Sequence, residues 1–382
     1  MTTLLNLNWD YTNADLFLGE SPLGISDLIN IAHPELERLA LLQRSQFWTE
    51  TEISLESDKK QWPTLPKDIQ DITLLNLAWQ TQTDTFISRA PDAALRPLVN
   101  RPELEGAFKQ WGYFEDLHSR AYQNIIRNVL TNPAEFIDSV VQNREAFARI
   151  ADSVELFDEL YQLGQYYLAV RDHRGDNTYP ETEYSEVKRE TQALLLKAMF
   201  AIYGLEAMQF YASFACTFAL AENDILQGIA KNLQLIAKDE ALHTQMSKTV
   251  IQIMFQQFDQ DLIDEALAEA PAQLLKTLKT EIEWGHFIFK GRSLIGLNAE
   301  LLEEYLYFVG RNAFMHIGVE WPSHLPVITK NPIPWIMNWL DTTSLQPAPQ
   351  EIQIGAAYRV GQVTETSADT LKDLGNEFEG MF

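Results

Sequence analysis

The chain has 382 residues, 46% of them hydrophobic, which is enough to bury a sizeable core. Its formal net charge of −25 argues against nucleic acid and anionic membranes as partners, because both attract basic surfaces. A single cysteine, Cys216, excludes an intramolecular disulfide and fits a reducing compartment. The N-terminus has neither a basic region nor a long apolar stretch, so we expect a soluble cytoplasmic protein.

The first part of the chain predicts irregular structure followed by two helices. Residues 1–34 mix Gly, Pro, Asn and Asp, and we expect them to wrap the surface. The helix that follows carries Trp48 at its end, where the usual role of an indole is to fill the core. Asp68 is expected to cap a second helix, which ends before a proline near residue 90. Asp84 lies in this helix and is the only charge in its part of the sequence.

The stretch 111–128 predicts a helix with a possible metal site on one face. Glu115, His118 and Tyr122 follow one another at spacings of three and four residues, so they share one stripe. A carboxylate and an imidazole one turn apart can bind the same metal ion, and the phenol would lie beside it. One Glu-x-x-His pair arises by chance in many chains of this length, so the interpretation depends on a second copy.

The second copy is formed by Glu240 and His243, in a helix predicted over residues 223–257. The preceding helix, 185–222, is apolar almost all round from residue 197 onwards, yet it holds Glu206 near its middle. A buried carboxylate without a partner costs several kcal/mol, so Glu206 is either neutralised or holds a cation. This apolar run is long enough to cross a membrane, but a central glutamate and the lack of an aromatic belt argue against that.

Further helices are expected over most of the remaining chain, with a polar break at 171–184. A third Glu-x-x-His, Glu283 and His286, is a control on the motif, because no apolar ligand helix surrounds it. We interpret it as surface or core filling and not as a metal site. These other helices are expected at residues 133–148, 150–172, 261–289 and 299–317.

Composition changes after residue 340, and this divides the chain. Residues 1–340 are predicted to be one all-α domain, whereas 341–382 are rich in Thr, Gln, Pro, Gly and Glu and read as a flexible tail. The tail ends in an acidic stretch with Phe378 and Phe382, which could dock in a groove on a partner. A disordered solubilising tail is the alternative.

Two Glu-x-x-His pairs on separate helices, joined by one carboxylate from each of two others, form the ligand set of ferritin-like dimetal proteins. The chain resembles one family of that class, the small (beta, radical-generating) subunit of class I ribonucleotide reductase, from about Trp48 to Tyr358. The resemblance is carried by W-G-Y-F-E-D-L-H-S-R-A-Y, L-E-A-M-Q-F-Y-A-S-F-A-C, I-A-K-D-E-A-L-H, N-P-I-P-W, and A-P-Q-E followed by a tyrosine. It implies a ferritin-like helical bundle with a dimetal carboxylate site in its core.

The resemblance also implies roles for individual residues. Asp84, Glu115 and His118 would bind one metal ion and Glu206, Glu240 and His243 the other, with some glutamates bridging. Asp239 would accept a hydrogen bond from His118, and Trp111 would donate one to a ligand carboxylate. Phe210, Phe214 and Ile236 would form an apolar pocket that protects a radical. Carboxylate and imidazole ligands without thiolates suit iron or manganese, so we expect two Fe ions, with Mn as the alternative.

By the same resemblance, the dimetal centre activates O2 and, with one electron through Trp48, oxidises Tyr122 to a stable tyrosyl radical. The radical passes by way of Trp48 and Tyr358 to a cysteine of the large (alpha) subunit, where a ribonucleotide is reduced to its deoxy form. Glu351 in the tail matches the family's tail glutamate. The resemblance further implies a homodimer of small subunits that is active only with the large subunit.

Other functions use similar residues. A ferritin-like oxidase or oxygenase would have the same ligands without radical export, but the combination of Tyr122, Trp48 and Tyr358 argues against it. Ferritins that store metal are much shorter and need no tail. A purely structural bundle would not bury Glu206 among phenylalanines. A manganese-dependent reductase also remains open, because the ligand types do not separate the two metals.

Overall fold

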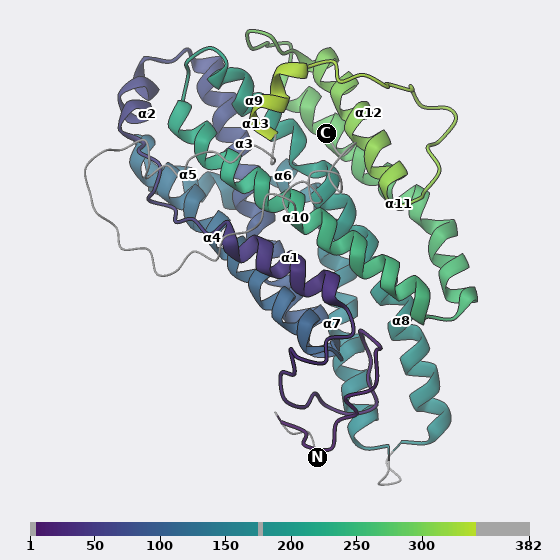
Figure 1. Cartoon of the computed structure of the whole chain (residues 1–382). Helices are drawn as coiled ribbons and strands as arrows, with labels where there is room; N and C mark the ends of the chain where they lie inside the picture. The colour runs from purple at the N-terminus through teal and green to yellow at the C-terminus, as the bar shows by residue number, and fades with distance from the viewer. Residues whose placement is uncertain (1–4, 175–178, 341–382) are drawn as a thin grey trace.

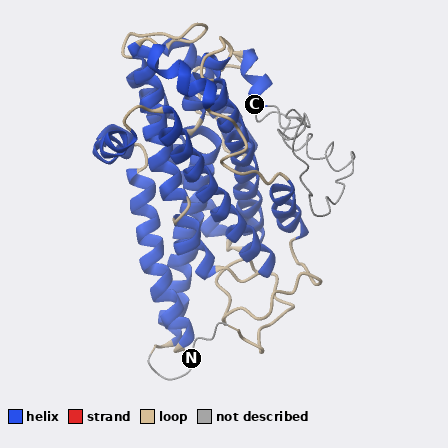
Figure 2. Ribbon diagram, turned by 90° about the vertical axis from the view of Figure 1, so that its left-hand side faces the viewer, coloured by secondary structure: helices blue, strands red, loops and turns tan. Residues whose placement is uncertain are grey.

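The computed structural model describes residues 5–174 and 179–340, and the described part is a bundle of long α-helices (Figures 1 and 2). No β-strand occurs within these ranges; two isolated bridges join Phe17 to Val99 and Leu294 to Leu297. The all-α prediction is therefore confirmed. The α-helices are α1 (Pro34–Ser45), α2 (Glu56–Gln61), α3 (Lys67–Ile87), α4 (Pro102–Val129), α5 (Pro133–Gln142), α6 (Arg144–Ala148), α7 (Ala151–Asp172), α8 (Glu181–Gly204), α9 (Tyr211–Ala221), α10 (Gln227–Gln257), α11 (Gln260–Phe289), α12 (Ala299–His316) and α13 (Met337–Leu340).

The central helices are α3, α4, α8, α9 and α10, and the others cover them. α4 packs against α1 and α3, while α10 packs against α1, α8 and α9, and α11 packs against α8 and α12. Figure 1 shows α1 and α10 crossing the front of the bundle, with α11 and α12 along one side. α7 and α8 form a long pair that runs to the end of the molecule where the N-terminal segment lies.

α4 illustrates why these residues form a helix that reaches the core. Pro102 begins it, and acidic residues in its first turn with Arg127 in its last turn complement the helix dipole. Its buried face includes Trp111, Glu115, His118 and Tyr122, in the order that a repeat of three and four residues dictates. The stripe predicted from the sequence is therefore the inward face of the helix.

Three helix boundaries differ from the sequence predictions. The predicted helix 133–148 is two helices, because Asn143 ends α5 and its side chain accepts a hydrogen bond from the Ala146 amide to begin α6. Trp48 lies beyond α1, which ends at Ser45. Asp68 lies in the first turn of α3 and does not cap it, since Pro66, two residues earlier, holds the cap position.

The largest difference is in the predicted helix 185–222. One π-helical turn, η4 (Leu205–Gln209), separates α8 from α9 and contains Glu206. The segment Glu181–Ala221 is the one described helix long and apolar enough to cross a membrane, but 83% of its most apolar window is buried inside the protein. It is thus the central core segment of the bundle.

Candidate metal centre

Six acidic and imidazole side chains from four segments meet in the middle of the bundle. α3 supplies one carboxylate, η4 supplies another, and α4 and α10 each supply a Glu-x-x-His pair. None of the six side chains is more than 1% exposed to solvent. They are Asp84, Glu115, His118, Glu206, Glu240 and His243.

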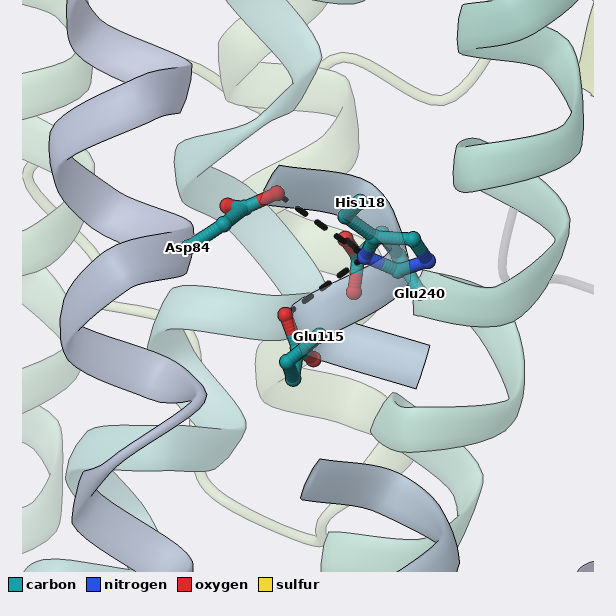
Figure 3. A group of neighbouring side chains, drawn as sticks. All are labelled: Asp84, Glu115, His118 and Glu240. Atoms are coloured by element: carbon teal, nitrogen blue, oxygen red, sulfur yellow. Dashed lines mark ion pairs between the residues drawn. The ribbon is translucent and has the colours of Figure 1, made fainter. Parts of the chain in front are cut away.

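These side chains form two overlapping groups, each able to hold a metal ion. Asp84, Glu115, His118 and Glu240 make the first group, and within it the candidate ligand atoms all lie within 4.8 Å of one another (Figure 3). The second group contains Glu206 and His243 together with the same two glutamates, at the same spacing. Because Glu115 and Glu240 belong to both groups, each offers one oxygen to either side of the centre.

Both imidazoles direct Nδ1 at the carboxylates. His118 Nδ1 lies 3.2 Å from Glu240 Oε1, 3.5 Å from Glu115 Oε2 and 3.8 Å from Asp84 Oδ2. His243 Nδ1 lies 2.8 Å from Glu115 Oε1, 3.0 Å from Glu240 Oε2 and 4.0 Å from Glu206 Oε2. The Nε2 atom of each ring is therefore left for partners outside the cluster.

The outer partner of His118 is Asp239, and Trp48 joins the same carboxylate. His118 Nε2 lies 3.1 Å from Asp239 Oδ2, and the Trp48 indole N–H donates to that oxygen at 2.8 Å. The Trp48 and His118 rings are stacked, with centroids 6.2 Å apart. The structure thus links an indole and an imidazole through a carboxylate that lies more than a hundred residues from each of them in the sequence.

The outer partners of His243 are Trp111 and Gln43. The Trp111 ring stacks on His243 at 4.8 Å, and its indole N–H donates to Glu115 Oε1 at 2.9 Å. The side-chain amide of Gln43 lies 2.6 Å from His243 Nε2. Sequence reasoning missed Gln43, although a glutamine on the buried face of α1, one turn after Leu39, was a usable signal.

The charges of the cluster strongly perturb its own protonation. Burial, and then the neighbouring carboxylates, raise the pKa of Asp84 and Glu206 well above the usual range. Burial alone would lower the pKa of each histidine, but the surrounding carboxylates outweigh it; they raise the pKa of His243 to about 9 and that of His118 well above its usual value. The pKa of Glu240 is lowered, since its two imidazole neighbours overcome the effect of burial.

The donor set fits a pair of cations. Several inward atoms have no hydrogen-bond partner among the described residues, including both carboxylate oxygens of Asp84 and Glu206 and Glu115 Oε2. Buried polar atoms without partners are costly, and so many pointing into one space indicate a missing positive charge. Oxygen and imidazole ligands without thiolate suit iron or manganese.

Tyr122 lies wholly buried one turn beyond His118 on α4. Burial, and next the charge of Asp84, raise the pKa of its hydroxyl well above the usual value. The predicted pocket residues Phe210, Phe214 and Ile236 are each no more than 1% exposed, and the two phenyl rings stack at 5.9 Å. The tyrosine and these three side chains therefore all lie in a core closed to solvent.

The remaining predicted site residues lie elsewhere. Glu283 is exposed, and His286 is 47% exposed and pairs with Glu303 at 2.7 Å, away from both groups. The predicted tail residues lie outside the described part of the chain. These are Glu351, Tyr358, Phe378 and Phe382.

Comparison with known proteins gives the family. A family model described as "Ribonucleotide reductase, small chain" matches residues 26–332. The chain belongs to this family. This chain is 32% identical over 382 residues to the ribonucleoside-diphosphate reductase 1 subunit beta of Salmonella typhimurium, with 98% of each chain covered. It is 31% identical to the corresponding beta subunit of Enterobacteria phage T4, covering 95% of this chain and 96% of that one.

Solved structures agree on the fold. A ribonucleotide reductase R2 subunit from Clostridium botulinum superposes with a TM-score of 0.72 at 19% identity, covering 89% of this chain and 98% of that one. The fold is thus the ferritin-like bundle of these small subunits, as expected from the sequence. The enzyme class is ribonucleoside-diphosphate reductase, and the buried carboxylate and histidine cluster is its candidate metal site.

Proposed function

We propose that this small subunit holds two metal ions at the six-residue cluster and uses them to generate a radical on Tyr122. Asp84, Glu115 and His118 would hold one ion and Glu206, Glu240 and His243 the other, with some of the glutamates serving both ions. The observation that carries the proposal is the set of unpartnered ligand atoms, which all belong to residues of the two overlapping groups. Iron is the proposed metal, and manganese is the alternative.

When bound, the two ions would supply the oxidising power, with O2 as the electron acceptor. The protein's part is to place one oxidisable side chain, Tyr122, beside the metal ligands. Tyr122 lies one turn from His118 on the same helix, and Asp84 has the largest electrostatic effect of any side chain on its hydroxyl. The high pKa of Tyr122 keeps its proton in place until the electron leaves, so electron and proton must depart together.

The Trp48, Asp239 and His118 contacts support a role in electron transfer. An oxidised indole has an acidic N–H, and Asp239 Oδ2 lies 2.8 Å away, ready to accept that proton. The same oxygen contacts His118 Nε2, so a proton accepted there remains within the hydrogen-bonded chain. Trp48 is thereby suited to give an electron to the centre or to receive the radical from it. Asp239 holds the indole and the imidazole in position, because one carboxylate oxygen contacts both rings.

Burial supports a long-lived radical. Tyr122, Phe210, Phe214 and Ile236 are almost entirely shielded from solvent, so water and reductants cannot reach the phenoxyl oxygen directly. The aromatic and aliphatic walls also lack groups that donate hydrogen atoms readily. A stable radical in the core is useful only if it can be passed on, which favours export over a self-contained oxidase reaction.

Export is proposed to use the tail and the large subunit. Tyr358 would relay the radical from Trp48 to a cysteine of the large subunit, where the ribonucleotide is reduced. Glu351, Phe378 and Phe382 would take part in docking, and two small subunits would form a homodimer. The family assignment supports this scheme, because the relatives are named as beta subunits of the reductase.

Low-temperature electron paramagnetic resonance tests the radical. Metal-free protein reconstituted with Fe(II) and O2 is expected to give a tyrosyl doublet, with two irons bound per chain. Tyr122→Phe should retain both irons and lose the doublet, whereas Tyr211→Phe, at a second buried tyrosine influenced by Glu206 and Glu240, should keep it. A doublet that persists in Tyr122→Phe would refute the radical assignment; two bound irons without any doublet would favour manganese or the oxidase reaction.

A further inference from the structure

The π-helical turn η4, which carries Glu206, is held in place by side chains from outside its own helix. A π-turn interrupts the regular ladder of backbone hydrogen bonds and leaves groups that need other partners. The amide of Ala212 donates to Glu281 Oε1 at 2.9 Å, and the carbonyl oxygen of Gln209 accepts from Arg149 Nη2 at 3.1 Å. The Gln209 side chain donates in return to the Arg149 carbonyl oxygen at 3.2 Å.

Arg149 and Glu281 are themselves a buried ion pair. Their side chains are 4% and 0% exposed, and Arg149 Nη2 contacts Glu281 Oε2. The guanidinium lies between two indole rings, 3.4 Å from the Trp79 centroid and 4.6 Å from the Trp284 centroid. Contact with both rings restricts how the guanidinium can turn.

Such a pair contributes little net stability. Apolar side chains of similar volume often stabilise a core as well as a buried ion pair does, because desolvation offsets the attraction of the charges. What the pair provides that apolar groups cannot is directional contact with the backbone at the C-terminal end of η4, at Gln209 and Ala212. Neither residue belongs to the groups able to hold a metal ion.

We propose that Arg149 and Glu281 are positioning residues for Glu206: together they fix the π-turn and thereby set the metal affinity of the position served by Glu206 and His243. The position served by Asp84 and His118 does not depend on η4, since α3 and α4 supply both residues. The inference rests on the proposed dimetal centre. It predicts that residues which are not ligands can lower the metal affinity of one position without changing that of the other.

The variant that tests this replaces both charges with apolar side chains, Arg149→Met together with Glu281→Leu. The core stays filled and no buried charge is left unpaired, so the fold should persist. The probe is Mn(II) alone, measured by the resonance signal of the free ion. Residues outside the ligands of a metal site typically change its affinity by 10- to 100-fold, and we expect about that loss at one position.

Variants that keep only one metal position show at which position the affinity changes. In His118→Ala, where only the Glu206 position remains, the double replacement should weaken binding by about 10- to 100-fold. In His243→Ala, where only the Asp84 position remains, it should leave binding unchanged. The matched control is Arg101→Met with Glu103→Leu, at a second buried Arg–Glu pair whose atoms are 3.1 Å apart. That control should leave both positions unchanged.

A second readout needs no metal. In the metal-free protein, the Ala212 amide should exchange its hydrogen faster in the double variant, because its acceptor on Glu281 is gone. Equal weakening of both metal positions would overturn the proposal, since it would indicate a general structural role. Unchanged affinity at both would also overturn it. Wild-type protein that fails to bind two Mn(II) ions would instead refute the dimetal centre itself.

Discussion

Metal binding at the buried cluster is expected to raise the midpoint of thermal unfolding by about 7 °C. A ligand that binds only the folded state stabilises it by about 2.7 kcal/mol when its concentration is 100 times Kd, so two ions give about 5 kcal/mol. Unfolding entropy of about 2.1 cal/mol/K per residue amounts to about 0.7 kcal/mol/K for the described part of the chain. The ratio of these two quantities is the expected shift.

Scanning calorimetry with Mn(II) and with a chelator measures this shift. His118→Ala removes a ligand of one position only, so about half of the shift, roughly 3 to 4 °C, should remain. His286→Ala is the matched control, because that histidine belongs to the exposed third Glu-x-x-His and pairs with Glu303. The reasoning would be refuted by a full shift in His118→Ala, or by loss of the shift in His286→Ala.

Two further predictions concern protons and the tail. The surrounding carboxylates outweigh burial and leave His118 and His243 protonated near neutral pH in the metal-free protein, with the pKa of His243 at about 9, whereas a bound metal needs neutral imidazole. Metal binding should therefore release protons at pH 7, and affinity should rise with pH through the pKa of His243 at about 9. Calorimetry in two buffers of different ionisation enthalpy measures the release, and no release at pH 7 would contradict the prediction. Truncation after Gln346 should leave metal binding and the radical intact and abolish binding to the large subunit in surface plasmon resonance; unchanged affinity would disprove docking through the tail.

The sequence was sufficient for those parts of the centre that depend on local spacing. A Glu-x-x-His pair on one helix face follows directly from the helical repeat, so Glu115, His118, Glu240 and His243 could be named in advance. Glu206 could be named because a carboxylate in an apolar run must either be neutralised or hold a cation. The all-α fold followed from the same periodicity.

Other features depend on contacts between distant segments, which a local pattern does not contain. Gln43 meets His243 across 200 residues of sequence, and Arg149 meets Glu281 across 132. The π-turn at 205–209 could not be predicted either, because a segment that is apolar on every face gives no periodicity to interrupt. On α11 the motif drew attention to Glu283, yet the buried acid is Glu281, two residues earlier.

The order in which the chain is made limits when its centre can be completed. Trp48 is hydrogen-bonded to a carboxylate 191 residues later, and α10 supplies the last two ligands. At about 5 to 20 residues per second, synthesis of that interval takes on the order of 10 to 40 s. Until α10 is made, the ligands on α3 and α4 lack Glu240 and His243, which complete the two groups. Both metal positions can therefore be filled only after α10 has been synthesised.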